Sequence, residues 1–136
     1  MKKIIIAFII MLPMLLFTNC YDRDVIDTKG FNHFLPKVEN LDYTRQGNVI
    51  RLTWLIPNNI STDFKRPLEV SIQLVENDIY KQKVIIGWEN TVASISIDVS
   101  KKNHFIVKLL GHLIVESREP GRSDIAYSQG QIIEIQ

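Results

Sequence analysis

The chain of 136 residues contains one cysteine, Cys20, and no excess of charge of either sign. A single thiol excludes an internal disulfide and any zinc site built from several cysteines. The formal net charge of +1 gives no argument for nucleic acid or an anionic membrane surface as a partner. The length suits one domain. We therefore expect a single domain that binds no nucleic acid.

Long apolar runs are absent except at the start of the chain. Lys2 and Lys3 precede an apolar run over residues 4–17. As a helix this run would extend about 21 Å at about 1.5 Å per residue, less than the roughly 30 Å of a bilayer core. A positive start followed by a short apolar run is typical of a secretory signal peptide.

The end of this run carries a cysteine where an ordinary cleavage site would need small residues. The residues Phe17-Thr18-Asn19-Cys20 resemble a bacterial lipobox, which Thr18 matches and from whose strictest form Phe17 and Asn19 depart. The resemblance implies that Cys20 is acylated and becomes the first residue of the mature chain. An uncleaved anchor helix that ends at Cys20 is the alternative. No His or Lys flanks the thiol, which argues against a reactive cysteine.

Acidic residues follow the cysteine at Asp22, Asp24 and Asp27. They resemble the surface-export signal of Bacteroidetes lipoproteins. The resemblance implies a protein anchored in the outer membrane through Cys20, and it leaves the cell-surface and periplasm-facing positions both open. We expect a signal peptide over residues 1–19, a tether over 20–35 and a folded domain over 36–136.

From residue 36 onward, hydrophobic and polar residues alternate in short runs. Ile50, Leu52 and Trp54, for example, alternate with Arg51 and Thr53. A period of two places one set of side chains in the core and the other in solvent, which indicates strands. We expect seven strands, near residues 38–45, 50–56, 68–74, 81–88, 94–99, 105–110 and 131–135. Seven antiparallel strands in about 100 residues predict an all-β sandwich of two sheets.

The order of these features resembles a fibronectin type III domain. Residues 49–54 followed by Ile56 and Pro57 are similar to the second strand of that family, with Trp54 in the core, and Ser128 with residues 131–135 is similar to the last strand. Phe105 stands where the family has a core tyrosine. The whole chain also resembles small, uncharacterised Bacteroidetes lipoproteins with one such domain, and this resemblance implies no activity.

Motifs of enzymes, metal sites and cofactor sites are absent. The sequence has no nucleophile elbow, no zinc-protease motif and no phosphate-binding glycine loop. The histidines are His33, His104 and His112. On one continuous strand, His104 and His112 would lie about 26 Å apart, too far to share a metal. We expect neither an enzyme nor a bound cofactor or metal.

Two loops carry the candidate binding residues, because binding side chains favour loops on a rigid scaffold. Residues 57–67 and 116–124 join strands at the same end of a sandwich of this type. Together the two loops offer six candidate binding residues, which are Phe64, Lys65, Arg66, Arg118, Glu119 and Arg122. The alternative is that both loops are solvated turns. The sequence favours an envelope lipoprotein that acts as a non-enzymatic protein-interaction module.

Two aromatic residues support a different function. Tyr80 and Trp88 bracket the fourth predicted strand, and exposed aromatic rings can stack on sugars. The alternative function is therefore a glycan-binding lipoprotein of a polysaccharide-uptake system. A small hydrolase or inhibitor is a third, less favoured interpretation.

Overall fold

A computed structural model describes residues 33–136, so the predictions for the signal peptide, for Cys20 and for most of the tether lie outside the described residues. The described part is all-β with one short 3₁₀ turn, η3 (Val115–Ser117). Its strands are β1 (Glu39–Gln46), β2 (Val49–Leu55), β3 (Glu69–Glu76), β4 (Ile79–Ile86), β5 (Val92–Ser96), β6 (Asn103–His112), β7 (Ile125–Tyr127) and β8 (Gln131–Ile135).

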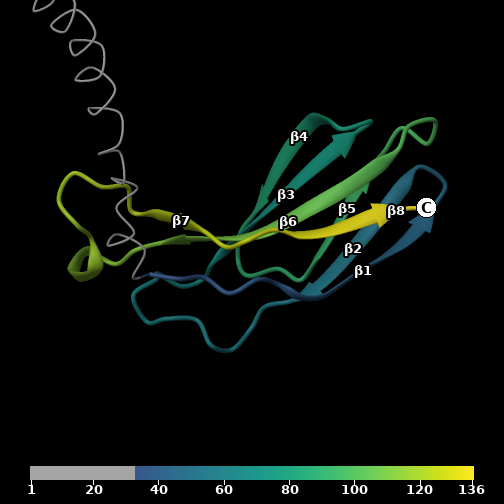
Figure 1. The fold of residues 1–136 in the computed structure, drawn as a ribbon. Coiled ribbons are helices and arrows are strands. Elements are labelled where there is room, and N and C mark those ends of the chain that lie inside the picture. The colour runs from purple at the N-terminus through teal and green to yellow at the C-terminus, as the bar shows by residue number, and fades with distance from the viewer. Residues whose placement is uncertain (1–32) are drawn as a thin grey trace, which may run out of the picture. The chain divides into compact units, whose positions relative to one another are not determined.

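The strands form two antiparallel sheets that enclose one core (Figure 1). The smaller sheet has the order β1-β2-β5; the larger has the order β4-β3-β6, with β7 and β8 both paired to β6. The alternation in β2 is realised as predicted, since Ile50, Leu52 and Trp54 are buried while Arg51 and Thr53 are exposed. These features confirm the predicted β-sandwich and the core position of Trp54.

The larger sheet contributes the other half of the core. Phe105, Val107 and Leu109 of β6 are fully buried, and Phe105 fills the place predicted for it. Leu35, predicted to lie in the tether, is also buried in this core, with 1% of its surface exposed. The chain therefore packs against the sandwich before residue 36.

The predicted seventh strand is present in two parts. β7 pairs with Leu110–His112 and β8 pairs with Asn103–Val107, so both lie along the same edge of β6. Between them, the backbone N–H of Ser128 donates to the carbonyl of Leu109 over 2.9 Å, and the Ser128 hydroxyl accepts the Leu109 N–H over 2.8 Å. A side-chain oxygen replaces a backbone acceptor here, which interrupts the ladder without leaving the buried N–H unpaired.

The domain has two unlike ends. We call residues 56–68, 87–91 and 113–124, together with residue 33 where the described chain begins, the loop end (Figure 1). The turns between β1 and β2, β3 and β4, and β5 and β6 form the hairpin end, where Gln136 also lies. The C-terminus is held there by a hydrogen bond from the Gln136 N–H to the Tyr43 hydroxyl over 3.1 Å.

Candidate binding site

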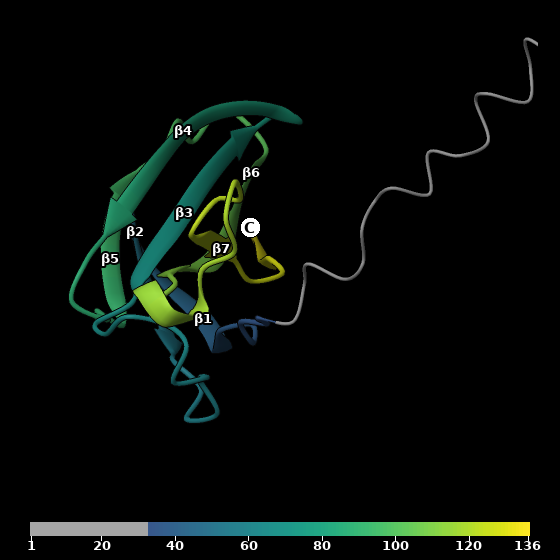
Figure 2. The same cartoon turned by 90° about the vertical axis from the view of Figure 1, so that its left-hand side faces the viewer.

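The three loops of the loop end are joined to one another by hydrogen bonds, and Figure 2 views the domain from this side. Backbone bonds run from the Lys65 N–H to the His112 carbonyl over 2.7 Å and from the Ile114 N–H to the Asp63 carbonyl over 2.8 Å. The Glu89 N–H donates to the Leu68 carbonyl over 3.0 Å. The loops therefore form one connected surface, as expected for loops at the same end of a sandwich.

Asp63 is the centre of this connection. Its carboxylate accepts hydrogen bonds from Ser117 over 2.7 Å and from Ser61 over 2.9 Å, and His33 Nδ1 lies 3.1 Å away. The bond from Ser117 is the main reason why the pKa of Asp63 is lowered from its ordinary value of 3.8, because it stabilises the charged form. A single carboxylate thus ties together the first loop, the third loop and the beginning of the described chain.

Arg66 joins the first loop to the second. Its guanidinium forms a two-point ion pair with Glu89, in which Nη2 lies 2.6 Å from Oε2. Glu89 also accepts the Leu68 N–H over 3.0 Å. The hydrogen bond from Arg66 lowers the pKa of the Glu89 carboxyl, and the same bond raises the pKa of Arg66. Arg66 is therefore already engaged within the domain.

The third loop uses its charges in the same way. Arg118 donates to the Leu113 carbonyl over 3.1 Å and lies 3.3 Å from Asp124, which is also 3.5 Å from His112 Nδ1. Arg122 pairs with Glu119 three residues earlier, at 2.9 Å. Lys65 differs from the three predicted arginines. Its side chain is exposed and forms no ion pair with any described residue.

The prediction that Phe64 offers its side chain to a partner is wrong. Phe64 is 2% exposed, and its ring packs against Gly111 and beside Leu35. The bridge between Phe64 and Leu113 pins the first loop to the end of β6. An aromatic residue in a polar loop is expected at the surface, and nothing in the local sequence indicates that this loop folds back over the core.

The two candidate glycan-stacking rings are both exposed, with 58% of Tyr80 and 83% of Trp88 accessible. They lie at opposite ends of β4, and Trp88 occupies a left-handed conformation with φ +62° in the turn after this strand. The intervening extended strand separates them by about 26 Å, at about 3.3 Å per residue. The two rings cannot stack on the same sugar.

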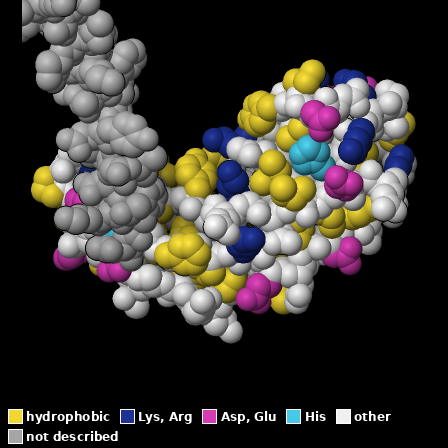
Figure 3. Space-filling model, viewed as in Figure 1, with side chains coloured by type: hydrophobic (Ala, Val, Ile, Leu, Met, Phe, Trp, Pro, Cys, Tyr) yellow, Lys and Arg dark blue, Asp and Glu magenta, His cyan; other side chains and the backbone are white. Residues whose placement is uncertain are grey.

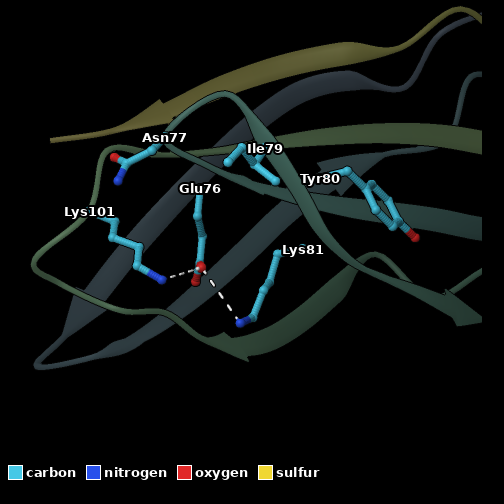
Figure 4. Close-up of a pocket in the computed structure, with 6 residues that line it drawn as sticks. All are labelled: Glu76, Asn77, Ile79, Tyr80, Lys81 and Lys101. Atoms are coloured by element: carbon cyan, nitrogen blue, oxygen red, sulfur yellow. Dashed lines mark hydrogen bonds and ion pairs between the residues drawn. The ribbon is translucent and has the colours of Figure 1, made fainter.

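A hollow of about 190 Å³ lies at the hairpin end, beside the turn between β3 and β4 (Figure 4). Glu76 lies at its base, 8% exposed, with Lys101 Nζ at 3.1 Å and Lys81 Nζ at 3.9 Å. Its carboxylate is thus neutralised from within the domain. The ring of Tyr80 points away from this carboxylate, so the hollow combines no aromatic platform with the acid.

The histidines do not converge on one place. His33 contacts Asp63, His112 lies 3.4 Å from Glu69 at the loop end, and His104 lies toward the other end of β6. Residues 33–136 contain no cluster of three or more potential metal ligands. In this same part of the chain, no helix is long and apolar enough to cross a membrane.

The sequence comparisons place the chain in a family. Residues 20–135 match the family described as a domain of unknown function, DUF4945, and the chain belongs to this family. No curated protein matches the sequence. The family description adds no activity to what the residues themselves indicate.

Proposed function

We propose that the protein is anchored to the bacterial envelope by acylation of Cys20 and acts there as a non-enzymatic protein-interaction module. The observation that carries the interaction role is the outer face of the larger sheet, where Ile85, Tyr127 and Ile132 are each between 46% and 59% exposed. Exposed apolar groups that gather on one face mark interaction sites in soluble domains.

Two observations at Cys20 support the anchor. The lipobox-like residues end at Cys20. The family match begins at the same residue, which is the first that an acylated mature chain would retain. We propose that the protein is a lipoprotein of the Bacteroidetes type that is anchored in the outer membrane through Cys20.

Replacement of Cys20 by alanine tests the anchor. We expect the wild-type protein to fractionate with membranes and to carry the mass of its acyl chains, and the variant to lose both. Membrane fractionation that is unchanged in the variant would refute acylation as the means of attachment.

Cross-linking in intact cells tests the interaction role. An amine-reactive cross-linker should join the wild-type protein to a discrete second protein, because the domain exposes many lysines. Only monomer at every cross-linker concentration would contradict the interaction role.

A glycan-binding function is the second candidate, and the exposure of Trp88 favours it. Binding on a glycan array that disappears in Trp88→Ala, while Tyr127→Ala retains it, would support this candidate. An array without signal would remove it.

A further inference from the structure

The outer face of the larger sheet is more apolar than a solvent-facing sheet surface requires. Residues opposite one another in the register place Ile85, Ser71 and Lys108 in one row across β4, β3 and β6. The next row contains Lys83, Gln73, Ile106 and Ile132. Leu110 and Tyr127 form a further pair near the loop end, and Tyr80 lies near the hairpin end. We call this surface the outer face.

Side chains from opposite edges of the larger sheet meet above the outer face. Lys83 Nζ on β4 lies 5.9 Å from the centre of the Tyr127 ring on β7, although β3 and β6 lie between these strands. A flat sheet would separate β4 from β7 by about 14 Å, at about 4.8 Å per strand. The two long side chains together bridge this separation over β3 and β6. Figure 3 shows hydrophobic side chains gathered with basic ones over the middle of the domain, where its surface is hollowed.

Ser71 lies at the centre of this surface. It is fully buried, although only neighbouring outer-face side chains can cover it, and its hydroxyl has no hydrogen-bond partner among the described residues. Leu110, on the same face, is 4% exposed. A buried hydroxyl without a partner is unfavourable. The Ser71 hydroxyl is therefore an unused donor and acceptor at the centre of the outer face.

The charges of the outer face are of one sign at its centre. Lys108 lies directly opposite Ser71 on β6, and Lys83 lies diagonally from Ser71 on β4. Within the described part of the chain, neither lysine forms an ion pair with a carboxylate. The acidic residues Glu69 and Glu134 lie toward opposite ends of the face. The middle of the face thus combines apolar side chains with two cations that no carboxylate of residues 33–136 neutralises.

We propose that the outer face docks an acidic, amphipathic segment of a partner protein, whose apolar side chains cover the isoleucines and whose carboxylates pair with Lys83 and Lys108. This inference rests on the proposed interaction function and adds the surface and the chemistry of the partner. A second copy of the chain does not fit, because two such faces packed across a two-fold axis would oppose their central lysines.

A charge-swap experiment tests the proposal. The probes are a fluorescent amphipathic peptide of leucine and glutamate at helical spacing and its counterpart with lysine for every glutamate. The mature full chain is held in neutral phosphatidylcholine nanodiscs, with empty nanodiscs as the blank, and binding is followed by fluorescence anisotropy. We expect the wild-type protein to bind the acidic peptide in preference to the basic one.

The variant Lys83→Glu/Lys108→Glu should weaken binding of the acidic peptide about tenfold or more and reverse the preference, because two exposed ion pairs are exchanged for repulsions. The control Arg51→Glu/Lys102→Glu makes the same change in net charge elsewhere and should leave the preference unchanged. Equal loss in both variants, or no preference in the wild-type protein, would overturn the docking face. The cross-linked adduct in intact cells does not depend on which face binds, so it reports separately on the interaction function.

Discussion

The loop end and the outer face of the larger sheet differ in how they use their polar side chains. At the loop end, Asp63 accepts hydrogen bonds from two serines and contacts His33. Arg66 is paired with Glu89, and Arg118 contacts Asp124. On the outer face, Lys83 and Lys108 have no ion pair within the described residues. Charge in a loop is therefore a poor guide to binding where the loop uses its charges to hold its own shape.

The largest expected effect on stability comes from the buried aromatic residue of the loop end, Phe64, and not from the exposed one, Trp88. Phe64→Ala should lower the free energy of unfolding by about 3–5 kcal/mol, because it leaves a cavity against Gly111 and Leu35. The exposed Trp88 is the control, and Trp88→Ala should change the free energy of unfolding by less than about 0.5 kcal/mol. Urea unfolding followed by tryptophan fluorescence measures both, because the buried Trp54 is retained in each variant. Equal effects would mean that the first loop does not pack as described.

A smaller effect comes from added volume under the same loop. A Cβ on Gly111 would lie 2.7 Å from Phe64 Cδ1 and 3.1 Å from Leu35 Cδ1. Gly111→Ala should therefore destabilise the domain by about 1–3 kcal/mol. Gly87 is the matched control because a Cβ there would meet nothing within 4 Å. A lower thermal unfolding temperature for Gly87→Ala than for Gly111→Ala would contradict the close packing of Gly111 against Phe64.

Two buried serines, Ser128 and Ser71, should differ in how much their hydroxyl groups contribute to the stability of the larger sheet. Ser128 accepts the Leu109 N–H and donates to the Gln129 carbonyl, so Ser128→Ala should cost about 1 to 2 kcal/mol. The Ser71 hydroxyl has no partner within the part of the chain that the structure describes. Ser71→Ala should leave stability unchanged or slightly raised in the unbound protein, and a loss as large as that of Ser128→Ala in urea unfolding would contradict an unused hydroxyl.

The smallest expected effect is the contribution of Asp63 to stability, and it changes only at acidic pH. Because the folded-state pKa of Asp63 is lowered, its contribution to stability is complete above about 3.8 and is lost as the pH falls through the folded-state value. Between pH 5 and pH 2, the wild-type protein should lose more stability than Asp63→Asn. Parallel stability curves for the two proteins, from urea unfolding at each pH, would contradict a role for this carboxylate.

Much of the fold could be predicted from the sequence, because period-two alternation in β2, β3 and β6 reports directly which side chains face the core. The interruption at Ser128 could not, since it depends on a hydrogen bond to a residue nineteen positions earlier.

The candidate site was harder to predict than the fold. The charge of Arg66 is misleading as a sign of binding, because the tertiary structure pairs this side chain with Glu89, 23 residues later. Phe64 is buried because its loop folds back over the core. Ser71, Lys83 and Lys108 gave no local signal, because their significance depends on strand register.

The most direct test of the account is site-specific photo-cross-linking in intact cells, with a photoreactive amino acid at Ile132 on the outer face or at Trp88 at the loop end. Both side chains are exposed, so neither replacement should disturb the fold. The account predicts an adduct to an acidic segment of a partner protein from position 132 and none from position 88. An adduct from position 88 alone would contradict the assignment of binding to the outer face.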